Sequence, residues 1–285
     1  MREGRPSATA ERAAVMRAVH HHHDRPRVLD DPIAIRLLDA ATATAVETDL
    51  ARYDTLPLRR LRATIAFRSR YAEDALRDAV DGGVAQYVVL GAGLDTFAYR
   101  SPLVRSGLRI FEVDHPETQA WKRALLRAAG IAPPAAVGFI STDFEREPLV
   151  DALARGGVDG TAPAFVSWLG VTIYLTRDAI RRTLAALASL APGSFVVFDY
   201  SVPPSSLPDA TRSARGVMAA RAAAAGEPWI THFEPNEVAS ELRAVGLTVL
   251  EDVAPERAID RYFCSRSDGL RPGSGGHVVR AIVGA

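Results

Sequence analysis

The sequence has a single cysteine, no net charge and no long apolar run. Its 285 residues include 34 basic and 34 acidic side chains, so charge gives no reason to expect binding to nucleic acid or an anionic membrane surface. Cys264 alone cannot form an internal disulfide or a cysteine metal cluster. We find no apolar run of about 18 residues and no signal-peptide core in residues 1–10. We therefore expect a cytoplasmic monomer or homodimer that binds neither nucleic acid nor membranes.

Several catalytic motifs are also missing. G-x-S-x-G, H-E-x-x-H and C-x-x-C do not occur, so neither a nucleophile elbow nor a zinc-protease helix is indicated, and we expect no metal site. The tract His20–His23 lies within a helical pattern that continues into native-looking sequence, unlike a terminal purification tag. We interpret this tract as a helix end or part of an active-site lid, with metal binding as the less favoured alternative.

The most informative segment present is a glycine-containing turn after an apolar run. Residues 87–90 are followed by Gly91 and Gly93, and a second apolar run ends about twenty residues later at Asp114. The glycines allow a tight turn close to a ligand, and the carboxylate can accept hydrogen bonds from a ribose. The third glycine of G-x-G-x-x-G is replaced by Thr96. This departure weakens the case for a pyrophosphate and favours a cofactor with adenosine but no phosphates; the alternative is a purely structural turn.

Three further residues extend this prediction. Glu112 points to the same side of its strand as Asp114, so it is expected either to share the ribose or to lie buried near the glycine loop. Asp114 can also cap the helix that starts at Pro116. Asp143 follows the third apolar run, and we expect it to accept a hydrogen bond from an adenine amino group while Phe144 helps to cover the base. The alternative is a helix cap with Phe144 in the core.

Arg68 stands out by its position on a helix. It lies three residues after Ile65 and four before Ala72, in the middle of an apolar stripe. An arginine on a buried face needs a partner, and its planar guanidinium matches a carboxylate. We expect Arg68 to bind the carboxylate of a cofactor that carries an amino acid. The alternative is an internal salt bridge to Glu73 or Asp95.

Apolar strand-like runs alternate with helical patterns through the middle of the chain, which favours a parallel sheet with helices on both faces. The strand-like runs are 87–90, 109–113, 138–141, 164–168 and 195–198, and the helical patterns between them are 117–129, 147–154 and 177–190. Two late runs, 247–253 and 277–283, are separated by a polar, glycine-rich loop and should pair antiparallel.

This layout predicts the α/β fold of class I methyltransferases, a Rossmann-like sheet with helices on both faces and an antiparallel C-terminal hairpin. We expect an N-terminal helical lid over residues 1–80 and a cofactor-binding domain over residues 81–285. A helical insertion at about residues 201–235 would complete the lid.

The motifs together resemble the leucine carboxyl methyltransferase-like family of S-adenosylmethionine-dependent methyltransferases, in its bacterial O-methyltransferase branch. The resemblance spans most of the chain and rests on segments 30–32, 68–71, 90–96, 111–116 and 168–172, which read DDP, RSRY, LGAGLDT, FEVDHP and WLGVT. It implies Arg68 at the methionine carboxylate, Gly91 at the methionine moiety and Asp114 at the ribose. Asp143 and Phe144 would lie at the adenine.

The full set of expected cofactor-binding residues is Arg68, Gly91, Gly93, Asp95, Glu112, Asp114, Asp143, Phe144, Trp168 and Leu169. For Trp168 the alternative is a place in the core. The eukaryotic carboxyl methyltransferases of this family have a glutamate near the end of the fourth strand, where this chain has Leu169. A protein C-terminal leucine is therefore not inferred as the substrate.

The resemblance implies an O-methyltransferase that moves a methyl group from S-adenosyl-L-methionine to a carboxylate or hydroxyl of a small molecule, such as a polyketide-type metabolite. The product would be S-adenosyl-L-homocysteine, formed by in-line displacement. A carboxylate needs no base, whereas a phenol with a pKa near 10 would benefit from one. Tyr174 and His232 are weak candidates for catalytic groups, and Tyr53 for the substrate chamber. The alternatives are a non-catalytic cofactor-binding or regulatory protein and an NAD-dependent oxidoreductase.

Overall fold

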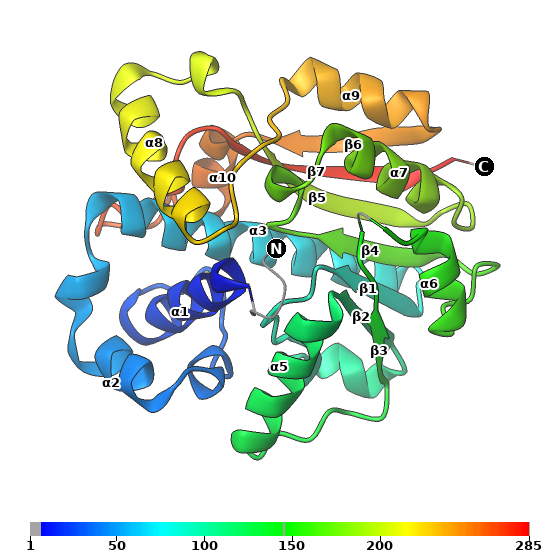
Figure 1. The fold of residues 1–285 in the computed structure, drawn as a ribbon, viewed down its shortest axis with the longest axis horizontal. Coiled ribbons are helices and arrows are strands. Elements are labelled where there is room, and N and C mark those ends of the chain that lie inside the picture. Colours follow the sequence, from blue (N-terminus) through cyan, green and yellow to red (C-terminus); the bar gives the residue numbers. More distant parts are fainter. Residues whose placement is uncertain (1–6, 145, 285) are drawn as a thin grey trace.

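The computed structural model describes residues 7–144 and 146–284 and contains one seven-stranded sheet (Figure 1). The strand order is β3-β2-β1-β4-β5-β7-β6. The strands are β1 Gln86–Leu90, β2 Arg109–Asp114, β3 Val137–Ser141, β4 Ala164–Trp168, β5 Phe195–Ser201, β6 Leu247–Val253 and β7 Gly276–Val283. Neighbours among β1 to β5 pair parallel, and β7 pairs antiparallel with both β5 and β6. The strand order reverses between β1 and β4, where open α/β sheets bind their ligands.

The helices are α1 Ala8–His23, α2 Ala40–Thr48, α3 Leu56–Asp81, α4 Phe97–Arg100, α5 Pro116–Ala128, α6 Leu149–Arg155, α7 Arg177–Ala188, α8 Asp209–Ala224, α9 Pro235–Ala244 and α10 Pro255–Tyr262. The expected α/β alternation and the antiparallel last strands are confirmed. One expectation was wrong, because α10 lies in the connection between β6 and β7 that the sequence analysis treated as a loop. The short, strongly polar composition of α10 concealed this helix, although a proline at its first position is typical of a helix start.

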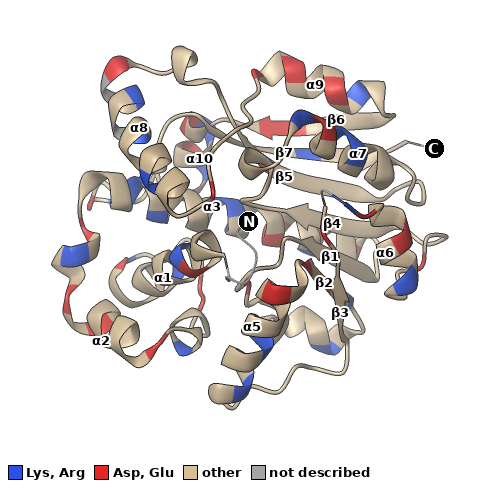
Figure 2. Cartoon of the chain, viewed as in Figure 1, with Lys and Arg blue, Asp and Glu red and all other residues tan. Residues whose placement is uncertain are grey.

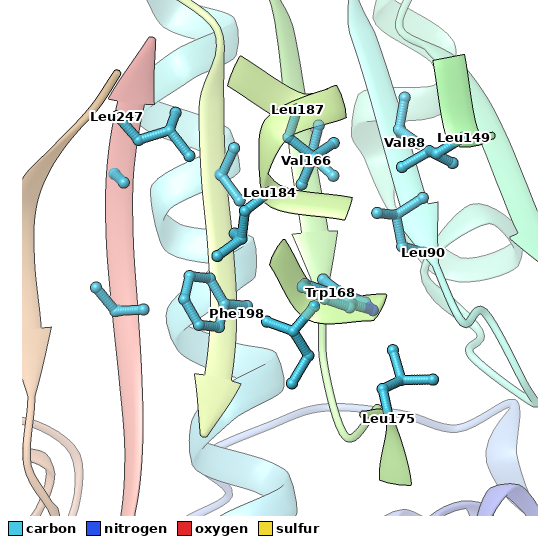
Figure 3. Packing of buried hydrophobic residues seen from close by; sticks show 14 of the residues in the cluster. Val88, Leu90, Leu149, Val166, Trp168, Leu175, Leu184, Leu187, Phe198 and Leu247 are labelled. Carbon is cyan, nitrogen blue, oxygen red and sulfur yellow. The ribbon is translucent and has the colours of Figure 1, made fainter. Parts of the chain in front are cut away.

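The central strands β1 and β4 are buried on both faces, and their successive side chains point to opposite layers. Val88, Val166 and Trp168 contribute to one layer, together with Leu184 and Leu187 of α7 (Figure 3). The alternate residues of the same strands pack in a second layer against α3; these are Tyr87, Val89 and Phe165. Figure 1 shows α6, α7 and α9 over one face of the sheet and α3 across the other.

The N-terminal helices are joined to the glycine loop through Asp31. Its Oδ2 lies 2.8 Å from Arg17 Nε and accepts a hydrogen bond from the Thr96 hydroxyl at 2.7 Å. Arg17 also donates to the carbonyl of Leu94. All three side chains in this cluster are buried. Thr96 stands where the third glycine would be, so the departure from the dinucleotide pattern has a structural cause: the threonine hydroxyl, through Asp31, connects α1 to the loop.

The histidine tract forms the end of α1. His20 is buried, and its Nε2 accepts hydrogen bonds from the backbone N–H groups of Val28 and Leu29 at 3.0 and 3.2 Å. Its Nδ1 lies 2.7 Å from Asp24 Oδ2. The helix-end interpretation is confirmed, and no group of three or more candidate metal ligands gathers among the described residues.

Charges of both signs are interspersed over the helices in Figure 2. No helix in the described part of the chain is long and apolar enough to cross a membrane. Residues 1–6, part of the segment for which we expect no signal-peptide core, lie outside the described residues.

Candidate functional site

A cavity of about 460 Å³ lies at the carboxyl ends of β1 to β4. Its walls come from the segments that follow these strands and from the start of α1: residues 91–95, 114–115, 142–144, 169–171 and 7–17 supply lining side chains or backbone. A volume of this size is typical of a site for a small molecule or cofactor. The position agrees with the point where the strand order reverses.

The glycine loop requires both of its glycines. Gly91 and Gly93 have φ values of +65° and +45°, which side chains rarely adopt. A Cβ on Gly91 would lie 2.3 Å from Val171 Cγ2, and one on Gly93 would lie 3.0 Å from the Cβ of Ala10. The helix after the loop, α4, has only four residues, and Asp95 Oδ1 accepts from the backbone N–H of Phe97 at its start. The loop therefore has no long helix N-terminus of the kind that binds pyrophosphate.

Asp114 lies at the end of β2 and lines the cavity. Its two carboxylate oxygens accept hydrogen bonds from the backbone N–H groups of Gly93 and of His115, the second at 2.7 Å. Burial raises the pKa of this carboxyl, and the two N–H donors only partly offset the rise. Each oxygen keeps a further lone pair, so the carboxylate can still accept hydrogen bonds from a diol in the cavity.

Glu112 does not line the cavity. The expectation that it shares the ribose was therefore wrong, and the alternative, burial near the glycine loop, holds. Its carboxylate is buried, with Oε2 2.7 Å from Nζ of Lys122, the only lysine in the sequence. The Tyr99 hydroxyl donates to the same oxygen at 3.3 Å. Glu112 and Asp114 share a strand face, but the glycine loop approaches only the end of the strand, so only Asp114 reaches the cavity.

Asp143 and Phe144 both line the cavity, and their contact with an adenine stays a prediction. Arg146 Nε lies 3.7 Å from Asp143 Oδ2. Phe144 also packs against the buried layer that contains β4 and α7. Its ring therefore belongs both to the cavity wall and to the core, the two positions that the sequence left open. Leu169 lines the same cavity from the end of β4.

Arg68 lies where this cavity meets a second one, and its internal partner is Asp199 of β5. Arg68 Nη1 donates to Asp199 Oδ2 at 2.8 Å, and Asp199 Oδ1 accepts from the backbone N–H of Gly170. The partners proposed from the sequence were wrong, because Glu73 pairs with Arg100 instead. A Cβ on Gly170 would lie 2.4 Å from Arg68 Nη2, so the guanidinium packs directly on this glycine.

The second cavity, of about 170 Å³, adjoins the first. Six residues line both cavities and form what we call the junction: Thr9, Ala13, Arg68, Gly170, Val171 and Tyr174. The Tyr174 hydroxyl accepts a hydrogen bond from Trp229 Nε1 at 3.3 Å, and burial raises its pKa. Tyr174 therefore stays protonated at neutral pH and can donate a hydrogen bond but not act as a base.

The start of α1 closes over the first cavity. The backbone N–H of Thr9 donates to Glu227 Oε2 at 2.9 Å, and the Thr9 hydroxyl donates to the same oxygen. This contact joins the start of α1 to the segment after α8.

Three expected residues lie elsewhere. Trp168 is fully buried and packs against Phe198 in the core, so the core alternative holds and a cofactor contact does not. His232 lines neither cavity; its carbonyl accepts from Arg177, and burial lowers the pKa of its imidazole. Tyr53 is buried among the N-terminal helices, so it does not line the second cavity.

Two residues near Arg68 were not expected from the sequence: Asp199, which pairs with it, and Thr9 of the junction. Asp199 ends an apolar run, in the pattern that drew attention to Asp114, so a signal for it was present. Thr9 carries no such signal, because only the tertiary packing of α1 brings it to the carboxyl ends of the strands.

A family model described as leucine carboxyl methyltransferase matches residues 10–188. A Bacillus subtilis relative named as a candidate S-adenosyl-L-methionine-dependent methyltransferase, YktD, is 32% identical over 303 residues, with 99% of each chain covered. A Mycobacterium marinum protein named in the same terms is 34% identical over 78% of this chain and 72% of its own. The crystal structure of a candidate methyltransferase from Thermobifida fusca has a TM-score of 0.62 and 21% identity, covers 100% of this chain and 97% of its own, and supports the fold.

Proposed function

We propose a methyl acceptor for this chain, which belongs to the leucine carboxyl methyltransferase family and is an S-adenosylmethionine-dependent methyltransferase. The acceptor is an oxygen atom of a small molecule, in a carboxylate or a hydroxyl group. An acid or phenol of polyketide type would meet this description. The observation that carries the proposal is the junction, where a cofactor-sized cavity meets a smaller, separate chamber.

The residues of the larger cavity fit the cofactor. Gly91 and Gly93 line the cavity after β1, and Asp114 offers acceptor lone pairs at the end of β2, where a ribose would lie. Asp143 and Phe144 provide an acceptor and a ring face for an adenine. Arg68 offers a cation at the opposite end for a methionine carboxylate. When bound, S-adenosylmethionine supplies a methyl group on a sulfonium.

Several features of the junction suit an oxygen acceptor that is already ionised. Tyr174 is protonated and can orient the acceptor through its hydroxyl. Asp199, which pairs with the junction residue Arg68, is also held by the Gly170 backbone. His232, the imidazole considered as a base, lies outside both cavities. A carboxylate or an acidic phenol needs no base, so positioning and exclusion of water suffice.

Methyl transfer can be tested with methyl-labelled S-adenosylmethionine and a panel of carboxylic acids, phenols and amines, with products identified by mass spectrometry. We expect label in an ester, which alkali hydrolyses, or in an alkali-stable ether. Label on nitrogen, sulfur or carbon would contradict the proposal. Tight binding of S-adenosylhomocysteine without methylation of any acid or phenol would favour a regulatory role.

A further inference from the structure

The smaller cavity contains more positive charge than its own carboxylates balance. Arginines from α1, α3 and α8 line it: Arg12, Arg60, Arg68 and Arg215. Among the described residues that line it, Asp199 is the one carboxylate, and it is paired with Arg68. Within residues 7–144 and 146–284, the other three arginines form no ion pair. Three cations therefore share a small chamber without a counter-charge from the chain.

Arg215 is the most confined of these cations. Its Nη2 donates to Ser201 Oγ at 2.5 Å, and its Nη1 lies 3.5 Å from the carbonyl of Ser274. Its Cζ lies 5.3 Å from the centre of the Trp229 ring. Burial lowers the pKa of Arg215, but a guanidinium still carries its charge at neutral pH. A partly buried cation with only neutral partners attracts an anion.

Arg60 approaches the same wall of the chamber from α3. Its side chain lies within 4 Å of the position that a Cβ on Gly273 would take, and Arg215 Nη1 lies 3.4 Å from the corresponding position on Gly275. Both arginines thus pack on one glycine-rich segment. Neither lines the larger cavity.

Trp229 connects this wall to the junction. One side of its indole contacts Arg215, and its Nε1 donates to the Tyr174 hydroxyl. Ile65 and Met218 add apolar surface to the chamber. The chamber is therefore lined by Arg215 and Arg60, by apolar side chains and, where it meets the larger cavity, by the junction.

We infer that the methyl acceptor carries, besides the oxygen that receives the methyl group, a separate anionic group, a carboxylate or a phosphate, that Arg215 and Arg60 bind. This inference rests on the proposed function. It assigns the acceptor to molecules with an acid at one end, an apolar body and a methylated oxygen at the other. The methylated oxygen and the anion are different groups, because the arginines that bind the anion lie outside the cofactor-sized cavity.

Binding can be measured without knowing the natural acceptor. The full-length protein, saturated with S-adenosylhomocysteine, is titrated calorimetrically with phenylacetate, phenyl phosphate and 2-phenylethanol. We expect at least one anion to bind roughly tenfold more tightly than the alcohol, and the two anions distinguish carboxylate from phosphate recognition. Equal binding of all three compounds would overturn the inference and leave the proposed function intact. Failure of S-adenosylhomocysteine to bind would contradict both.

Variants test the assignment to Arg215. Arg215→Met keeps an apolar stem against Trp229 and should reduce the preference for the anion roughly tenfold, with S-adenosylhomocysteine affinity unchanged. Arg60→Met should give a smaller loss in the same direction. The matched control is Arg212→Met on the same helix, where the side chain is exposed and pairs with Asp209. An unchanged preference in a folded Arg215→Met protein would overturn the inference.

The product offers a second measurement. A bacterial small-molecule extract incubated with enzyme and methyl-labelled cofactor should yield labelled products that still bind an anion exchanger, because the distal acid survives methylation. Labelled products that pass through the exchanger uncharged would overturn the inference while supporting the methyltransferase function.

Discussion

Arg68 Nη1 and Asp199 Oδ2 lie 2.8 Å apart where the two cavities meet, joining the long helix α3 to strand β5. Asp199 engages one nitrogen of the guanidinium, and a guanidinium has five N–H donors. Arg68 can therefore keep this internal partner and still bind an incoming carboxylate. The pair also fixes the orientation of the arginine before any ligand arrives, which reduces the entropy lost on binding.

We predict that Arg68→Ala weakens binding of S-adenosylhomocysteine by about tenfold or more, since charged hydrogen bonds contribute about 1.5–3 kcal/mol. Arg70→Ala is the matched control, because Arg70 lies two residues away on the same helix and pairs with Asp74 in partial exposure to solvent. Calorimetric titration measures both affinities. Equal effects of the two substitutions would contradict the prediction that Arg68 binds the carboxylate of the cofactor.

Asp114 should make cofactor binding depend on pH. Its ionised form accepts hydrogen bonds from hydroxyls, and burial raises its pKa above the ordinary value for aspartate. Affinity for S-adenosylhomocysteine is therefore expected to fall as the pH is lowered, starting at a higher pH than for an exposed aspartate. Asp114→Asn should bind more weakly at neutral pH and lose this pH dependence. A wild-type affinity that is flat across the acid range would contradict the assignment.

The raised pKa of Asp114 also makes the free energy of unfolding depend on pH, in the direction opposite to that of cofactor affinity. A carboxyl whose pKa is raised in the folded protein stabilises the fold when it is protonated, so this contribution is lost as the pH rises through the folded pKa. Without ligand, Asp114→Asn should therefore lack this loss of stability with rising pH, while its amide, with a single acceptor oxygen, leaves one of the two backbone N–H groups of Gly93 and His115 without an acceptor. Urea unfolding with and without S-adenosylhomocysteine separates the two effects.

Asp31 should be essential to stability, unlike its neighbour Asp30. Asp31→Ala leaves the buried Arg17 without its carboxylate and removes the acceptor of the Thr96 hydroxyl, which we expect to cost about 3–5 kcal/mol. Asp30→Ala should change stability by less than about 0.5 kcal/mol because Asp30 is 69% exposed. Urea unfolding measures both. Similar losses would show that Asp31 does not hold α1 to the glycine loop.

Lys122 and Glu112 should behave as a buried ion pair. Lys122→Met leaves the Glu112 carboxylate buried without its cation and should destabilise the fold by about 3–5 kcal/mol. The double variant Glu112→Leu with Lys122→Met should recover much of that loss, because no charge remains buried. S-adenosylhomocysteine affinity of the folded double variant should match the wild type, since Glu112 does not line the cavity. A large loss of S-adenosylhomocysteine affinity in the folded double variant would indicate that Glu112 does contact the cofactor.

Local sequence patterns were sufficient to predict a cavity residue where that residue directly follows a strand. Gly91, Asp114 and Asp143 were identified because each comes immediately after an apolar run, and parallel strands bring such positions to one edge. Arg68 was identified because one charge interrupts an apolar stripe. The helix α10 was missed because its eight residues, although amphipathic, are mostly polar and border a polar, glycine-rich stretch of the sequence.

The sequence by itself determined the order of strands and helices, the glycine turn and the acids at the strand ends, because these depend on side-chain period and on backbone conformations that few residues adopt. Only the tertiary structure decided that Arg68 pairs with Asp199, that Glu112 turns inward to Lys122, and that Thr9 and Arg215 face the cavities. These contacts join residues far apart in the chain, and local propensity carries no information about which distant side chains packing brings together.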